Sequence, residues 1–176
     1  MRFDIVLNNL AGLAWTTGEI RMTSDGTPWR PLVHVLDICD AIAAALEAPR
    51  QTIHNQIFNV GDTQENYRVR EIAEAVAAAF PGCKLTIGTS DGDSRSYRVN
   101  FDKINEQLGW QAQRTIHDGA RQLYEIFRRI DMSLDTFRSR PFTRLNQLKH
   151  LVATNQIDDD FYWTAQEMPQ AAMVAD

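Results

Sequence analysis

Apolar residues recur at helical spacing in five stretches of the chain, which are 3–14, 38–48, 68–80, 115–130 and 145–151. Side chains three or four positions apart share one face of a helix, so each stretch predicts a helix with one apolar face. The first two of these helices are followed by residues that stop helices, namely Gly18 and Pro49. The stretch 115–130 opens with Thr115 and Asp118, the spacing of a capping box.

Three shorter stretches have strand character. Glu19 to Thr23 alternates polar and apolar residues, and Lys84 to Ile87 lies between two glycines. Gln56 to Gly61 is apolar through Ile57, Phe58 and Val60, a pattern typical of a strand buried on both faces. Helices mixed with short strands predict one mixed α/β domain over residues 1–165, followed by a flexible tail over 166–176.

The segment from Thr23 to Asp37 holds the strongest candidate binding residue. Asp25-Gly26 favours a tight turn, and Pro28 and Pro31 stiffen the chain on both sides of Arg30. A guanidinium held in this way suits a phosphate or carboxylate ligand. The alternative is structural, with Arg30 packing over Trp29 or pairing with Asp25.

After this arginine the chain predicts a strand and then a helix. Leu32, Val33 and Val35 form a brief apolar run, and Asp37 is predicted to cap a helix that starts at Ile38. His34 falls within the run, where a histidine is more often a packing residue than a catalyst.

The net charge, the apolar runs and the cysteines argue against several classes of function. The 176 residues carry a net charge of −5, which argues against a general nucleic-acid or anionic-membrane surface. No apolar run approaches the length of a membrane span. The only cysteines, Cys39 and Cys83, lie far apart and predict neither a disulfide framework nor a metal site, which fits a cytoplasmic protein.

The order of several motifs resembles the second half of extended short-chain dehydrogenases/reductases, the NAD-dependent nucleotide-sugar epimerases and dehydratases. The motifs are Asp25-Gly26, Arg30, Val33-His34-Val35, Asp37, Phe58-Asn59-Val60-Gly61, Gly92-Asp93, Asp102-x-x-Lys and Leu108-Gly109-Trp110. The last two resemble the family's closing helix, so the resemblance implies a helix near 102–109. The resemblance implies a truncated extended short-chain fold, with the substrate domain plus the last strand and helix of the Rossmann-like domain.

The same resemblance implies binding residues for a nucleotide sugar. It assigns Arg30 to the substrate's phosphates and Asn8 or Asn9 to the nucleotide diphosphate, without deciding between the two asparagines. The arginine that commonly precedes Gly92-Asp93 is Ser90 here, so Arg95 or Arg98 can take its role, with Arg95 preferred. For both asparagines, a solvated helix face is the simpler alternative, and for the arginines a self-satisfied charged loop.

The family's catalytic and cofactor motifs do not occur in this sequence. None of the four tyrosines is followed four residues later by lysine, and no Gly-x-x-Gly-x-x-Gly turn follows a strand. We therefore expect no catalytic residue and no cofactor bound by this chain alone, with NAD implied for the intact enzyme.

Two functions of different classes follow. In the first, the chain is the nucleotide-sugar-binding half of an epimerase or dehydratase, either naturally truncated or a fragment, and is inactive alone. In the second, it is a non-enzymatic module that forms a homo-oligomer or docks onto a separate NAD-binding chain. The second is motivated by the apolar strand 56–61, which needs partners in a sheet.

Overall fold

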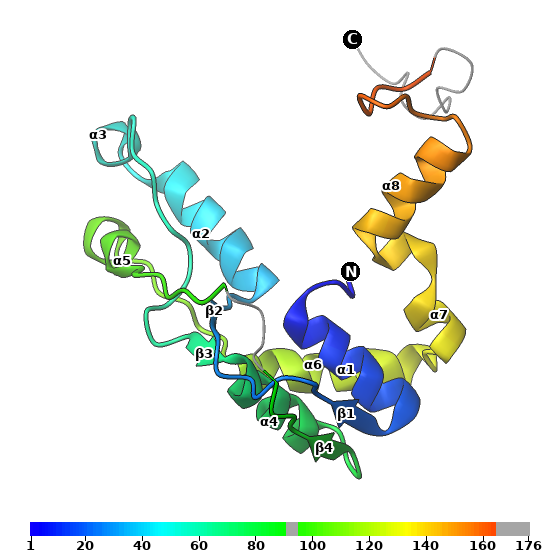
Figure 1. The fold of residues 1–176 in the computed structure, drawn as a ribbon. Helices are drawn as coiled ribbons and strands as arrows, with labels where there is room; N and C mark the ends of the chain where they lie inside the picture. Colours follow the sequence, from blue (N-terminus) through cyan, green and yellow to red (C-terminus); the bar gives the residue numbers. More distant parts are fainter. Residues whose placement is uncertain (91–94, 165–176) are drawn as a thin grey trace.

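The computed structural model describes residues 1–90 and 95–164. Figure 1 shows its secondary-structure elements in chain order. The helices are α1 (Val6–Thr17), α2 (Val35–Glu47), α3 (Arg50–Ile53), α4 (Val69–Ala79), α5 (Asp102–Leu108), α6 (Ile116–Ile130), α7 (Leu134–Arg138), the 3₁₀ helix η1 (Arg140–Phe142) and α8 (Arg144–Ala153). The strands are β1 (Glu19–Arg21), β2 (Trp29–Pro31), β3 (Asn66–Arg68) and β4 (Lys84–Thr86).

The main core lies where α1, α4 and α6 pack together beside the parallel pair β1 and β4. Its largest fully buried apolar side chains are Phe127, Ile20, Ile72 and Val76. Phe127 contacts the rings of Phe3, Trp15 and Phe80, with ring centroids 6.0 to 6.4 Å apart. The predicted mixed α/β fold class is confirmed.

Two arms extend from this core in Figure 1. One arm carries α2, α3 and α5, and the other carries α7 and α8. A second, smaller apolar cluster joins α2 to α5 through Ala41, Ile104 and Trp110. Most of the buried apolar residues belong to the main core, so the arms hold much less of the apolar packing.

The predictions for α1, α4, α5 and α6 are confirmed. Gly18 and Gly109 end their helices in the left-handed conformation, as glycine at these positions favours. Thr115 caps α6 by accepting from the backbone N–H of Asp118, whose carboxylate accepts from the N–H of Thr115 at 2.9 Å. Strands at 19–21 and 84–86 also lie within the predicted stretches.

The predicted start of α2 is wrong. The helix begins at Val35, and its cap is His34, whose Nδ1 accepts a hydrogen bond from the N–H of Leu36 at 3.2 Å. Asp37 is therefore inside the first turn rather than before it. Its side chain is only 1% exposed, because it turns away from its own helix toward Arg114.

The predicted strand at Gln56 to Gly61 is absent from the described part of the chain. These residues are irregular, and the side chain of Ile57 is 84% exposed. A strand forms only where neighbouring strands satisfy its backbone groups, and the two described sheets both lie elsewhere. The segment thus has the apolar pattern of a strand, but no described strand lies beside it to pair with it.

The C-terminal helix α8 forms as predicted, although its leucines pack less than expected. Leu148 and Leu151 are half-buried, while Leu145 is largely exposed. The predicted tail at 166–176 and the motif Gly92-Asp93 lie outside the described residues.

Candidate functional site

Arg30 lies in a two-stranded antiparallel ribbon formed by β2 and β3, where it pairs with Tyr67. Residues 25–27, where a tight turn was predicted, are irregular, although the predicted glycine has a positive φ. Gly26 has a φ of 68°, and a Cβ there would lie 2.7 Å from the backbone nitrogen of Arg70, so only glycine fits. The carboxylate of Asp25 accepts from the N–H of Thr27 at 3.0 Å. The conformation of this segment thus fixes the direction in which the chain enters β2.

The guanidinium of Arg30 is held by backbone carbonyls and by one aromatic ring. Its Nη1 donates to the carbonyl oxygens of Trp29 and Arg95, both at 2.6 Å, and its Cζ lies 5.5 Å from the ring centroid of Tyr97. Two of the predicted binding residues, Arg30 and Arg95, are therefore brought together although 65 positions separate them. The two carbonyl acceptors orient the guanidinium.

Asn8 and Asn9 lie in the first turns of α1 and bond to the segment just before it. Asn8 Nδ2 donates to the carbonyl of Arg2 at 2.8 Å, and Asn9 Nδ2 donates to the carbonyl of Phe3 at 3.0 Å. Both amide groups therefore have structural partners. Among the described residues, no hydrogen bond joins either asparagine to the Arg30 cluster.

A buried ion pair beside α2 was missed by the sequence analysis. Asp37 Oδ1 pairs with Arg114 Nη1, and Asp37 Oδ2 accepts from the backbone N–H of Arg114 at 3.1 Å. The same guanidinium also reaches the exposed Asp40 at 3.1 Å. The contact fixes α2 to the segment before α6. The Asp-x-x-Asp spacing was visible in the sequence, but its partner lies 77 positions away from Asp37.

The ribbon is tied to α6 by a tyrosine and a glutamate. The hydroxyl of Tyr67 donates to Glu65 Oε1 at 2.8 Å, and Glu65 Oε2 accepts from the N–H of Ile116 at 3.3 Å. Burial, followed by the bond to Glu65, raises the pKa of Tyr67 well above its ordinary value. A tyrosine that holds its proton so firmly is unsuited to act as a general base near neutral pH.

A cavity of about 220 Å³ lies in the arm that carries α2, α3 and α5, and none of the four predicted binding residues lines it. Its lining includes Asp62, Asp102, Glu106 and Trp110. Three carboxylates make it unfavourable for a diphosphate. Within residues 1–90 and 95–164, no group of histidine, cysteine and carboxylate side chains is arranged to hold a metal ion, and no helix is both long and apolar enough to cross a bilayer.

Part of the chain matches a known protein family. Residues 3–61 match the NAD dependent epimerase/dehydratase family, and this range includes Asn8, Asn9 and Arg30. Over these residues the chain is similar to that family. The resemblance noted in the sequence is confirmed.

The relatives are considerably longer than the matched region. The chain is 31% identical over 105 residues to UDP-glucose 4-epimerase of Rhizobium leguminosarum bv. trifolii, covering 58% of this chain and 32% of that enzyme. It is also 31% identical over 93 residues to the UDP-glucose 4-epimerase of Homo sapiens, covering 51% of this chain and 26% of that enzyme. The chain spans between 15% and 32% of the lengths of the curated relatives it matches.

Solved structures support the fold. UDP-glucose 4-epimerase with UDP-glucose, from Thermotoga maritima, superimposes with a TM-score of 0.57 at 22% identity, covering 73% of this chain and 40% of that chain. MoeE5 in complex with UDP-glucose and NAD also gives a TM-score of 0.57 at 22% identity, covering 75% and 44%. The chain thus has the fold of part of these two proteins.

Proposed function

We propose that the chain is the nucleotide-sugar-binding half of an NAD-dependent epimerase or dehydratase and has no catalytic activity alone. In this proposal, Arg30 and Arg95 contact the diphosphate, and Asn8 and Asn9 contact the diphosphate or sugar. The observation that carries it is the Arg30 cluster, in which a ribbon and two carbonyls orient a guanidinium. Anion recognition by arginine needs no catalytic base.

The relatives support the choice of ligand. Two solved structures with the same fold are described with UDP-glucose, one of them together with NAD. The chemistry of the intact enzyme, a hydride exchange between sugar and NAD, needs residues that this sequence does not carry. NAD therefore belongs to the intact enzyme and not to this chain. With two cysteines that are both free thiols, we further propose a reducing cytoplasmic setting.

Isothermal titration with UDP-, GDP-, CDP- and dTDP-sugars tests the proposal. We expect one nucleotide sugar to bind, NAD not to bind, and Arg30→Ala to abolish the binding. Arg30→Lys keeps the charge but loses the planar fork, so it should bind more weakly than the unmodified chain. Arg129→Ala, on the exposed surface of α6, is the matched control and should bind normally.

Circular dichroism must show that each variant is folded, because Arg30 also bonds to two carbonyls. A folded, unmodified chain that binds none of the nucleotide sugars would refute the proposal.

A second candidate function is self-association, and a specific surface favours it. Four apolar side chains of α2, at Val35, Ile38, Ile42 and Leu46, are spaced along one helix face and are exposed. Leu46 is 80% exposed, and the equally exposed Ile57 lies in the unpaired segment 56–61 of the same arm. Contiguous exposed apolar side chains of this kind mark interaction surfaces.

We propose that a second copy of the chain covers this α2 face, which we define as Val35, Ile38, Ile42 and Leu46. Sedimentation equilibrium should give a dimer or larger species, and Ile42→Ser with Leu46→Ser should give a monomer of unchanged helix content. A monomeric unmodified chain at high concentration would refute self-association. If such a monomer instead bound a separately produced NAD-binding chain, docking would replace it as the function of the α2 face.

A further inference from the structure

The β2–β3 ribbon has two chemically different faces. Residues paired across antiparallel strands project to the same side, and successive residues project to opposite sides. Arg30 is paired with Tyr67, whereas the preceding Trp29 is paired with Arg68. The first pair therefore belongs to the face of the proposed nucleotide-sugar site, and the second pair belongs to the opposite face.

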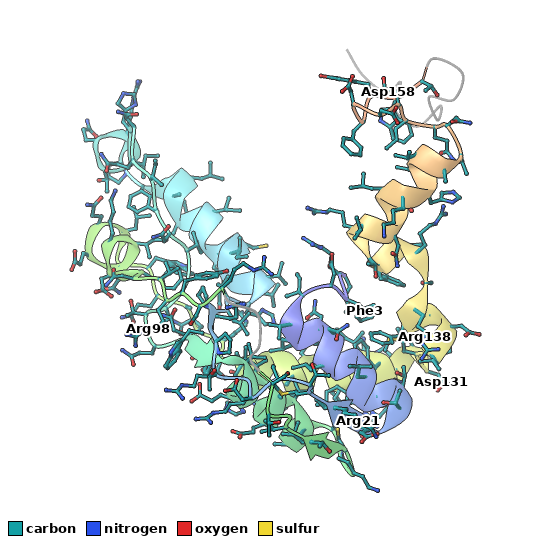
Figure 2. All side chains as sticks on the ribbon, viewed as in Figure 1. Phe3, Arg21, Arg98, Asp131, Arg138 and Asp158 are labelled. Carbon is teal, nitrogen blue, oxygen red and sulfur yellow. The ribbon has the colours of Figure 1, made fainter. Side chains whose placement is uncertain are left out.

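The segment 95–98 continues this alternation along the other edge of β2. The N–H of Trp29 donates to Ser96 Oγ at 3.1 Å, and the N–H of Tyr97 donates to the carbonyl of Trp29 at 3.4 Å. Tyr97 then contacts Arg30 on the first face, while Arg98 contacts Trp29 on the second. Figure 2 shows Arg98 on the side of the molecule that carries this ribbon, away from the arm that carries Asp158.

The second face places two cations on one aromatic ring. The Cζ atoms of Arg68 and Arg98 lie 5.2 and 5.1 Å from the ring centroid of Trp29. Within residues 1–90 and 95–164, neither guanidinium forms an ion pair or donates a side-chain hydrogen bond. Two carboxylates lie near Arg68. Glu71 Oε2 accepts from the backbone N–H of Arg68 at 2.6 Å, and the pKa of Asp25 is lowered chiefly by bonds from Thr27, with smaller contributions from the charges of Arg70 and Arg68.

We propose that Trp29, Arg68 and Arg98 form a second oxyanion site, for a phosphate monoester or inorganic phosphate, on the ribbon face opposite Arg30. Both guanidiniums lie against the same ring, and a dianion that contacted both would be attracted by two positive charges. Their N–H groups suit phosphate oxygens, and stacking on the indole reduces the side-chain freedom lost when an anion binds. This site goes beyond the proposed nucleotide-sugar function and does not depend on it.

The fluorescence of Trp29 provides a local readout. Inorganic phosphate and glucose 1-phosphate are titrated separately at low ionic strength, which limits screening of surface charges. A saturable change is expected in the unmodified chain and is expected to be lost in Trp29→Phe, which identifies the ring that responds. Tighter binding of glucose 1-phosphate would assign the site to a phosphorylated metabolite, and equal binding would assign it to the free anion.

The decisive variant is Arg68→Gln with Arg98→Gln. It should weaken phosphate binding at least about ten-fold, as expected for two lost charge-assisted bonds. The control Arg50→Gln with Arg129→Gln removes the same charge from two exposed positions elsewhere and should change the affinity by less than about two-fold. Equal weakening in both variants, or no saturable signal in the unmodified chain, would overturn the proposal.

The proposed nucleotide-sugar site and the second oxyanion site can be tested independently. UDP-glucose binding measured by calorimetry reports the Arg30 site, and we expect it to survive in the Arg68→Gln/Arg98→Gln variant. Loss of phosphate binding with retention of UDP-glucose binding, or the reverse in Arg30→Ala, would distinguish the second oxyanion site from the proposed function.

Discussion

The core around α6 and the arm around α2 contain helices of similar length but opposite character. In the core, the apolar faces of α1, α4 and α6 cover one another, and Phe127 is completely buried. On the arm, α2 buries Asp37 and Ala41 while it exposes Val35, Ile42 and Leu46. The difference teaches that an apolar helix face does not by itself create a core. What matters is whether another element of the same chain covers it.

Truncation of the central ring of the core should have the largest effect. Phe127→Ala removes a fully buried side chain that contacts three other aromatic rings. We expect it to lower the free energy of unfolding by about 3–5 kcal/mol, measured by urea denaturation. Leu46→Ala on the arm is the matched control and should cost less than about 0.5 kcal/mol at a concentration low enough to keep the chain monomeric. Similar losses at both positions would mean that the α2 face is covered in solution.

The next effect is expected at the polar contact that anchors the arm. Asp37→Ala leaves Arg114 without its buried partner and should cost about 2 kcal/mol, the scale of a hydrogen bond to a charged group. Asp40→Ala removes an exposed carboxylate from the same guanidinium and should cost less than about 0.5 kcal/mol. Thermal unfolding of both variants measures the difference. Equal costs would show that burial of Asp37 is not what anchors α2.

A smaller effect is expected at the start of α6. Thr115→Ala removes the oxygen that accepts from the N–H of Asp118 and should cost about 1 kcal/mol in urea denaturation. Thr115→Ser keeps the hydroxyl and should stay close to the unmodified chain. If both variants lost the same stability, the methyl group rather than the cap would be responsible.

The smallest effects are expected in the pH dependence of stability. The carboxylates of Glu65 and Asp118 should change the stability in opposite directions as the pH rises. Burial raises the pKa of Glu65 in the folded chain, so its contribution to stability is present below its unfolded pKa and is lost as the pH rises through the folded value. Hydrogen bonds from Thr115 lower the pKa of Asp118, so its contribution is present above its unfolded pKa and is lost as the pH falls through the folded value.

Unfolding curves between about pH 3 and pH 7 separate the two contributions, since unfolded glutamate and aspartate titrate near 4. Relative to the unmodified chain, Glu65→Gln should become more stable as the pH rises. Asp118→Asn should become less stable over the same rise. An unchanged difference across this range, for either variant, would contradict the corresponding pKa direction.

Much of the helical framework could be read from the sequence because helix boundaries depend on near neighbours. Gly18 ends α1 where expected, and the Thr115 to Asp118 spacing starts α6. Each signal acts through backbone groups within four residues, so no distant partner is required. The positive φ of Gly26 was predictable for the same reason.

Tertiary structure alone decided the features that depend on distant segments. Gln56 to Gly61 has the apolar pattern of a strand but no strand beside it in the described chain, while Asp37 looks like a cap and instead pairs with Arg114. The two faces of the ribbon also exist only because 29–31, 66–68 and 95–98 come together. Strand pairing and burial of charge depend on residues far along the chain, and the secondary-structure propensity of a short segment does not identify those residues.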